Sequence, residues 1–269
     1  MSDSKSADKL PVLGFLGTGT INSALVRAIC RAELPEYPIV VSPRSADRAA
    51  ALAAEFPGRV SVAASFQEVV DRADCVFVAI LPKAVEEVYR SLRFPDEMHI
   101  IDLTPSVTEE QVREWTGWQG EFSHIIPLAF VAELRGPMVL YPPESSIRGM
   151  MEKIADLVPL DDRRVVAAGQ ILTSFEAPFF TLLDMMTDWA VELGFDRELA
   201  CAYVSGLFRA MSEHACMSGP ERLHDLADEF TPGGFNWRSK NYINERDGIR
   251  MWIDIGRQMM DDLNSKLGK

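Results

Sequence analysis

The first half of the chain alternates short apolar runs with amphipathic segments, and this alternation restricts the fold more than any other feature. Five apolar runs predict strands, and helical periodicity lies between them; the runs are residues 10–16, 39–41, 60–63, 75–81 and 98–103. The run 75–81 is apolar at nearly every position, as expected of a strand covered on both faces. Strand and helix in repeated succession predict a doubly wound α/β domain over residues 1–160.

A glycine-rich loop follows the first of these predicted strands. It reads Gly14-Phe-Leu-Gly17-Thr-Gly19-Thr-Ile-Asn22 and opens a predicted helix. In a Rossmann-type turn one glycine permits the bend, the next lets the backbone approach a pyrophosphate, and the helix N-terminus offers free amides. We therefore expect nucleotide contacts from Gly14, Gly17, Thr18, Gly19, Thr20 and Ile21. Asn22 replaces the third glycine, so helix and strand are expected to be slightly further apart. The alternative is a structural turn without a ligand.

The tip of the second predicted strand distinguishes the two nicotinamide cofactors. It reads Val41-Ser42-Pro43-Arg44-Ser45 and has no acidic side chain to accept from the 2′-hydroxyl of NAD. A 2′-phosphate prefers guanidinium and hydroxyl donors. Ser42, Arg44 and Ser45 supply them, with Arg48 one turn further on, so the sequence predicts NADP as the cofactor. A surface arginine without a ligand is the alternative.

Residues 161–269 have helical periodicity throughout. The segment 177–193 is apolar on nearly every side, because it carries Phe179, Phe180, Met185, Met186 and Trp189. A helix that is apolar all round must be buried all round, and a domain of this length offers little depth. We therefore expect an all-α dimerisation domain whose helices a second chain covers, in a homodimer or a higher oligomer.

Charge and composition argue against several classes of partner. The chain has 27 basic and 40 acidic residues, a net charge of −13, which disfavours nucleic acid and anionic membrane surfaces. We expect no membrane-spanning segment, because no stretch approaches the roughly 20 apolar residues that one needs. Residues 1–9 lack a signal-peptide core, so we expect a disordered lead-in and a cytoplasmic protein. The four cysteines and four histidines are dispersed, which predicts reduced core thiols and no metal.

Together these segments resemble the pyrroline-5-carboxylate reductase family. The glycine loop, the Ser42–Ser45 strand tip and Val78-Ala79-Ile80-Leu81-Pro82 match its first domain, and Thr231-Pro232-Gly233-Gly234 resembles its signature between two helices. The resemblance implies a Rossmann-type domain followed by a helical domain that interlocks with its partner's. It also places Ile80, Leu81 and Pro82 at the cofactor. The implied activity is NAD(P)H-dependent reduction of a cyclic imine to proline, in proline biosynthesis.

The resemblance also implies a substrate site. Its expected contacts are Pro127, Glu176, Thr231, Gly233, Gly234 and Asn236. In the family, amides after the glycine pair bind the substrate carboxylate, and a hydroxyl two residues beyond the pair lies near the imine nitrogen. Asn236 stands at that position and is the predicted catalytic residue, since its amide both donates and accepts. The alternatives are that Asn236 caps a helix and that Glu176 is a helix N-terminal carboxylate.

The chain departs from the family pattern around the substrate. Leu81 stands where the family has lysine, and Phe235-Asn236 stands where it has two threonines. Three functions remain open. The first is an NADP-dependent reductase of pyrroline-5-carboxylate or a similar cyclic imine. The second is a reductase of a different imine or carbonyl substrate on the same scaffold, and the third is a non-catalytic NADP-binding regulatory protein.

Overall fold

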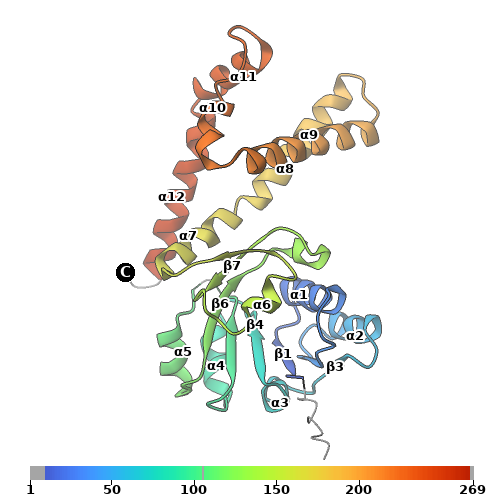
Figure 1. The fold of residues 1–269 in the computed structure, drawn as a ribbon, viewed down its shortest axis with the longest axis vertical. Coiled ribbons are helices and arrows are strands. Elements are labelled where there is room, and N and C mark those ends of the chain that lie inside the picture. The colour runs from blue at the N-terminus through green and yellow to red at the C-terminus, as the bar shows by residue number, and fades with distance from the viewer. Residues whose placement is uncertain (1–9, 105, 267–269) are drawn as a thin grey trace, which may run out of the picture. The chain divides into compact units, whose positions relative to one another are not determined.

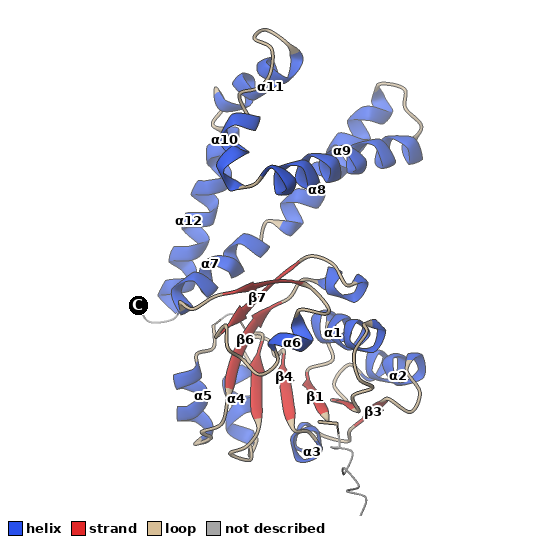
Figure 2. Ribbon diagram, in the orientation of Figure 1, coloured by secondary structure: helices blue, strands red, loops and turns tan. Residues whose placement is uncertain are grey.

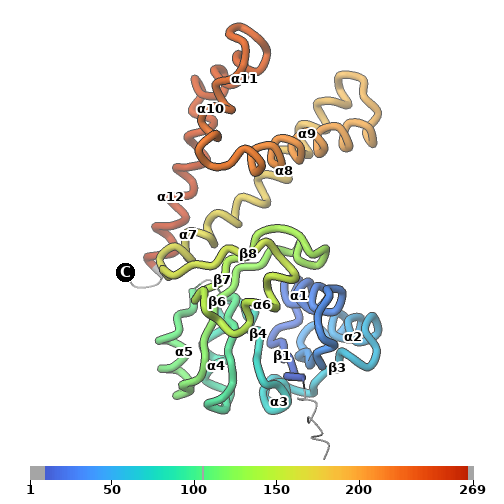
Figure 3. Tube along the Cα trace, viewed as in Figure 1, coloured from blue at the N-terminus to red at the C-terminus, as the bar shows by residue number. Residues whose placement is uncertain are grey.

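The structure is a computed structural model that describes residues 10–104 and 106–266, so the expected lead-in at residues 1–9 lies outside the described residues. The chain divides into two compact units, the first ending at Gln170 and the second beginning at Ile171. Figure 3 follows the chain through both. The boundary expected at residue 160 falls directly after the last strand, whereas the structural division lies within the helix that follows it.

The first unit contains one eight-stranded sheet (Figure 1). Its strands are β1 (Leu13–Leu16), β2 (Ile39–Val41), β3 (Val60–Val62), β4 (Cys75–Val78), β5 (His99–Asp102), β6 (Phe122–Ile126), β7 (Pro137–Tyr141) and β8 (Asp156–Pro159). The spatial order is β3-β2-β1-β4-β5-β6-β7-β8, with β6 and β7 antiparallel and the other neighbours parallel. The order reverses between β1 and β4, as in doubly wound nucleotide-binding folds. The Rossmann-type prediction is therefore confirmed, although only β1–β5 had been predicted.

Helices cover both faces of this sheet (Figure 2). They are α1 (Thr20–Arg31), α2 (Ala46–Glu55), α3 (Phe66–Arg72), α4 (Val85–Ser91), α5 (Glu109–Thr116) and α6 (Arg148–Met151), with the 3₁₀ turn η1 (Ala129–Glu133). One core joins β1 to α1, α2, η1 and α6, and the other joins it to α3, α4 and α5. Within β1, Leu13 and Phe15 enter the first core while Leu16 enters the second. This alternation explains why strands covered on both faces are apolar throughout.

The second unit is helical, as predicted. Helix α7 (Arg163–Thr173) leads into it, and it contains α8 (Glu176–Glu192), α9 (Arg197–Ser218), η2 (Pro220–Arg222), α10 (Leu223–Leu226), α11 (Phe235–Asn244) and α12 (Gly248–Lys266). Gly194 has φ +102°, and the Asp196 carboxylate accepts from the amides of Glu198 and Leu199 at 2.9 and 3.2 Å. Gly194 therefore ends α8, and Asp196 caps α9. Phe179 of α8 packs edge-on against Phe208 of α9.

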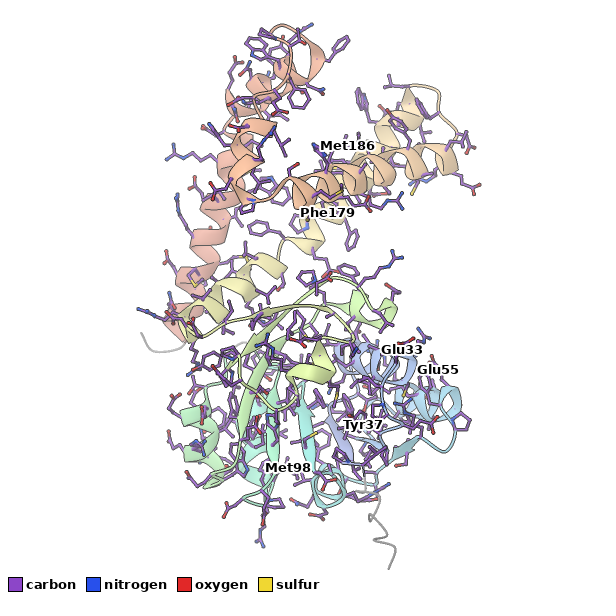
Figure 4. The ribbon with its side chains drawn as sticks, in the orientation of Figure 1. Glu33, Tyr37, Glu55, Met98, Phe179 and Met186 are labelled. Atoms are coloured by element: carbon purple, nitrogen blue, oxygen red, sulfur yellow. The ribbon has the colours of Figure 1, made fainter. Side chains whose placement is uncertain are left out.

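Much of the apolar surface of this unit is uncovered within the single chain. Met185 and Trp189 of α8 are 66% and 59% exposed, and Figure 4 labels Phe179 and Met186 on the same helix. Cys201 and Cys216 of α9 are exposed as well. The expectation of four core thiols is therefore wrong for these two, because the described part of the chain leaves both residues exposed.

Helices α7 and α8 also bear on the expectation that no segment could span a membrane. The stretch Arg163–Glu192, which joins α7 and α8, spans 30 residues, and an 18-residue window within it has a mean hydropathy of 1.3. By length and composition this stretch could cross a membrane. The expectation that no segment approaches a membrane span is wrong, because α7 and α8 count as one stretch, although neither helix alone is long enough. Apolar helices of soluble proteins pass the same test, so the criterion is weak evidence for a membrane.

Candidate nucleotide site

The site begins at the carboxyl end of β1, where the order of the parallel strands reverses. Gly17 has φ +88°, and a Cβ atom there would lie 2.3 Å from the Ala79 carbonyl oxygen. Both the left-handed backbone and this close approach require glycine. Gly14, by contrast, lies within β1, where a Cβ would meet the Cβ of Ala73 at 2.8 Å. The missing side chain of Gly14 thus allows α3 and its flanking residues to pack on the sheet, which gives this glycine a packing role apart from the predicted nucleotide contact.

The N-terminus of α1 is open beyond the turn. Gly19 is the N-cap residue, no side chain caps the helix, and a Cβ built on Gly19 meets nothing within 4 Å. Thr20 and Ile21 are the first helical residues, and amides at this end of a helix have no intrahelical acceptor. Space above Gly19 and unpaired helix amides are the two properties that a pyrophosphate needs. The described residues of this turn therefore fit a dinucleotide.

The hydroxyls of Ser42 and Thr18 hold the turn in place. Ser42 is fully buried, and its Oγ accepts from the Gly17 amide at 2.9 Å. Thr18 Oγ1 donates to the Ser42 carbonyl at 2.7 Å and lies 3.1 Å from Ser42 Oγ. Once Ser42 Oγ donates to Thr18 Oγ1, neither hydroxyl has a proton for a ligand. The hydrogen bonds of Ser42 thus lie within the turn, which argues against its predicted contact with the 2′-phosphate. The Thr18 hydroxyl is buried at the same place and is likewise used within the turn.

Asn22 has a structural role in the glycine turn that its position in the motif does not reveal. Its buried side-chain amide donates to the carbonyls of Leu16, Gly17 and Phe77 at 3.1, 2.8 and 3.3 Å. It therefore ties the end of β1 and the glycine turn to β4. The usual third glycine permits close packing at this point, whereas here an amide in the same place stabilises the turn by hydrogen bonds.

The basic side chains lie on the exposed segment after β2. Arg44 and Ser45 are both exposed. Ser45 has φ +67° at the N-cap of α2, and its side chain makes no capping hydrogen bond. A serine in this left-handed conformation costs roughly 1–2 kcal/mol, and strain of this kind is concentrated at functional sites. Arg48 of α2 donates to Thr20 Oγ1 at 3.2 Å and so reaches the N-terminus of α1.

The segment after β4 lies at the same edge of the sheet as the glycine turn and the segment after β2. Ile80 is buried, and its Cδ1 would lie 3.2 Å from a Cβ on Gly17. Leu81 is 56% exposed, and Pro82 is exposed too. Because β4 pairs with β1, the structure brings Ile80 against the glycine turn, and Leu81 and Pro82 follow at the same edge.

A buried acid lies at the end of β5, and the sequence analysis did not single it out. Asp102 is fully buried. Burial raises the pKa of this carboxyl to about 7, although hydrogen bonds from Tyr89 and Thr104 and the charge of Arg163 oppose the shift. Burial likewise lowers the pKa of His124 to about 4. His124 Nδ1 lies 3.9 Å from Asp102 Oδ1, but a neutral imidazole does not form an ion pair near pH 7.

The predicted substrate residues fall in both units. Pro127 follows β6 in the first unit and is buried. Four of the others meet in one turn of the second unit, where Gly233 has φ +80° and the Gly234 amide donates to the Thr231 carbonyl at 3.0 Å. Gly234 is the N-cap of α11, with no side-chain cap. Asn236 is the second residue of that helix and is exposed. The alternative that Asn236 caps the helix is wrong, because Gly234 occupies the cap.

Glu176 stands apart from this turn, as the first residue of α8. A carboxylate at this position interacts favourably with the helix dipole. Across the described residues, no group of three or more metal-binding side chains lies together.

Comparisons with known proteins agree with this geometry. Residues 12–106 match the family described as NADP oxidoreductase coenzyme F420-dependent. The matched residues include the sheet edge built by β1, β2 and β4 with its glycine turn. The chain is therefore a pyridine-nucleotide-binding oxidoreductase with a Rossmann-type domain.

Relatives define the family more closely. The pyrroline-5-carboxylate reductase of Pseudomonas aeruginosa is 24% identical over 200 residues, which cover 71% of this chain and 72% of that protein. The crystal structure of the Streptococcus pyogenes 1-pyrroline-5-carboxylate reductase superposes with a TM-score of 0.82 at 17% identity, covering 95% of this chain and 99% of the other. An imine reductase from Myxococcus stipitatus in complex with NADP⁺ has a TM-score of 0.55 at 18% identity, covering 96% and 94%. Over most of its length the chain is therefore similar in sequence and fold to pyrroline-5-carboxylate reductases.

Proposed function

We propose that the chain is an NADPH-dependent reductase of the C=N bond in a small cyclic imine carboxylate such as pyrroline-5-carboxylate. The turn at Thr231–Gly234 is the observation that supports this substrate class best. Gly233 and Gly234 leave the backbone bare, and α11 begins directly after them without a side-chain cap. Amides at the start of a helix suit a carboxylate.

NADP is the proposed cofactor on the strength of the segment after β2. Arg44 and Ser45 are exposed there, and the Ser45 side chain is not used as a cap. A guanidinium and a hydroxyl at this place are the donors that a 2′-phosphate requires. The NADP⁺ complex of the Myxococcus stipitatus enzyme is consistent with this choice.

The residues of the chain have a limited chemical task in such a reaction. NADPH supplies the hydride when it is bound, so the protein must position the substrate and exclude water. The α11 amides would hold the substrate carboxylate. Asn236, on the first turn of α11, would form a hydrogen bond with the imine nitrogen or the amine that it becomes, because its amide can donate and accept.

A second candidate is a reductase of a bulkier, less polar imine or carbonyl compound. Leu81 is exposed where the family has lysine, and Phe235 is 89% exposed where it has threonine. Apolar side chains at these two positions favour a substrate with more apolar surface. A regulatory NADP-binding protein without turnover is the third candidate.

One set of assays separates the three candidates. The purified chain is given NADPH and either pyrroline-5-carboxylate, a panel of larger cyclic imines, or keto acids with amines, and NADPH oxidation is followed. Turnover that is fastest with pyrroline-5-carboxylate supports the first candidate, and a role in proline biosynthesis is then tested by rescue of a proline-requiring strain. Turnover confined to larger imines supports the second. Tight NADPH binding without turnover of any compound supports the third.

We also propose a homodimer built by the second unit. Met185, Trp189 and other large apolar residues of α8 and α9 are exposed in the single chain, whereas soluble monomers rarely leave extended apolar patches in water. A second copy with the same surface would bury it. Sedimentation of detergent-free protein at micromolar concentration should give a dimer or a larger assembly, whereas a stable, well-folded monomer would contradict the proposal.

A further inference from the structure

The ends of β4 and β5 are joined by more than the strand ladder. The Leu103 amide donates to the Val78 carbonyl at 2.9 Å, just beyond the paired residues. Further along, Thr104 Oγ1 donates to the Ile80 carbonyl at 3.3 Å. Thr104 and Ile80 are both buried. A single side-chain hydroxyl therefore links the two strand ends where the regular sheet has stopped.

Asp102 holds Thr104 in position. Its Oδ1 accepts from the Thr104 amide and its Oδ2 accepts from the Tyr89 hydroxyl, each at 2.6 Å. Three side chains from three elements face this carboxyl: Tyr89 from α4, His124 from β6 at 3.9 Å and, through its charge, Arg163 from α7. Burying a carboxyl is costly, and its raised pKa reflects that cost. An apolar residue here would avoid the cost but would lose the bond to Thr104.

The glycine turn rests on the same end of β4. The Ala79 amide donates to the Leu16 carbonyl at 3.0 Å, and the absent Cβ of Gly17 leaves room for the Ala79 carbonyl and the Ile80 side chain. Residues 79 and 80 therefore occupy the space beside Gly17 that a side chain would otherwise fill. A shift of residues 79–80 would therefore change the turn itself.

We propose that Asp102 and Thr104 are positioning residues for the cofactor site, which hold the end of β4 against the glycine turn through the Ile80 carbonyl. Neither side chain is assigned a contact with the cofactor. Both act through the backbone that carries Ile80, Leu81 and Pro82. The inference rests on the proposed function only in taking NADPH as the ligand of the turn.

A pair of nearly isosteric variants tests the role of the hydroxyl. Thr104→Val keeps the methyl group and removes the hydroxyl, whereas Thr104→Ser keeps the hydroxyl and removes the methyl group. The dissociation constant of NADPH is measured by fluorescence titration of the full chain, together with the unfolding midpoint. Thr104→Val should weaken NADPH binding about 3- to 10-fold, as expected for one lost neutral hydrogen bond. Thr104→Ser should stay within about twofold of wild type. A role in packing alone reverses this order.

Thr116→Val is the matched control. Thr116 Oγ1 also donates to a backbone carbonyl, that of Val112 at 2.7 Å, but it does so at the end of α5. This variant should lose similar stability and keep its NADPH affinity. Thr104→Val with unchanged NADPH affinity would overturn the inference while leaving the proposed function intact. A wild-type chain that does not bind NADPH would overturn both.

Asp102→Asn adds a readout that a purely structural role would not move. Asparagine can still accept from the Thr104 amide, and it can donate to the Tyr89 hydroxyl, which also accepts. A bond to each partner is kept, with its direction at Tyr89 reversed, and the ionisable group is removed. The NADPH affinity of wild type should change as the pH passes through 7, because ionisation of Asp102 alters its hydrogen bonds with the Thr104 amide and the Tyr89 hydroxyl and so the position of Ile80. The affinity should be less pH-dependent in the variant. Equal pH profiles would remove Asp102 from the proposal.

Discussion

Alanine should have different effects at two glycines of the same turn: it should lower stability at Gly17 and weaken NADPH binding at Gly19. At Gly17 the left-handed backbone alone costs an alanine roughly 1–2 kcal/mol, and the new Cβ would lie 2.3 Å from the Ala79 carbonyl oxygen. That oxygen belongs to backbone held against β1, so it cannot move cheaply. We expect Gly17→Ala to lower the free energy of unfolding by about 3 kcal/mol. At Gly19 the backbone lies at φ −84° and ψ −172°, which alanine readily adopts.

Gly19→Ala should therefore leave the fold intact and disturb only the ligand. A Cβ at Gly19 meets no atom of the described chain within 4 Å, so the unfolding free energy should change by less than about 0.5 kcal/mol. If the space is there for a pyrophosphate, NADPH binding should weaken at least about tenfold, or 1.4 kcal/mol. Denaturant unfolding and NADPH fluorescence titration measure the two effects. Gly149→Ala, also in open space, is the control. A Gly19→Ala variant that binds NADPH as tightly as wild type would refute the reasoning.

Three further predictions concern charge, the substrate and pH. Arg44→Ala should weaken NADPH binding by about 1–3 kcal/mol and hardly affect NADH; an equal loss for both would reject the 2′-phosphate assignment. Asn236→Ala should lower kcat/KM on the true substrate while NADPH affinity stays normal. Asp102→Asn should reveal a pH dependence of folding stability. His124, with its pKa lowered to about 4, lowers the stability of the protein as the pH falls from 6.5. Asp102, with its pKa raised to about 7, lowers it as the pH rises from 3.8. These opposing effects of about 3–4 kcal/mol nearly cancel in wild type, so in the variant the unfolding free energy should fall by about 3 kcal/mol between pH 6.5 and 4; a flat profile would contradict this.

The strands that could be predicted are those whose burial shows in the sequence. Strands β1, β2 and β4 are buried along their whole length and contain no polar side chain. Strand β5 is buried too, and its polar residues, His99 and Asp102, stand at its two ends and leave Ile100 and Ile101 adjacent. Strand β6 is buried as well, yet it contains Ser123 and His124. Ser123 Oγ bonds to His99 Nε2 at 2.9 Å and to Ser145 Oγ at 2.6 Å. A buried polar network satisfies these groups, and periodicity alone does not reveal such a network.

Individual contacts in the nucleotide site were harder to predict than the site itself. The glycine pattern requires a backbone conformation, so Gly17 and Gly19 could be assigned directly. A hydroxyl has no such constraint: Ser42 points into the turn, while Ser45, three residues later, is exposed. The two look equivalent in the sequence. Their difference arises from the pairing of β2 with β1, which places the Ser42 side chain beneath the Gly17 amide.

The same reasoning explains why the cofactor is easier to infer than the substrate. The nucleotide turn is backbone geometry, fixed by Gly17 and by the carbonyl of Ala79 inside one unit. The proposed substrate residues are exposed side chains such as Asn236 and Phe235 on α11. In the proposed homodimer their surroundings would depend on how much apolar surface the second copy covers. If a homodimer buries that surface and Phe235 then lines the substrate site, replacing Phe235 by threonine should shift substrate preference toward smaller imines. If Phe235→Thr leaves the order of preferred substrates unchanged, Phe235 does not determine substrate choice.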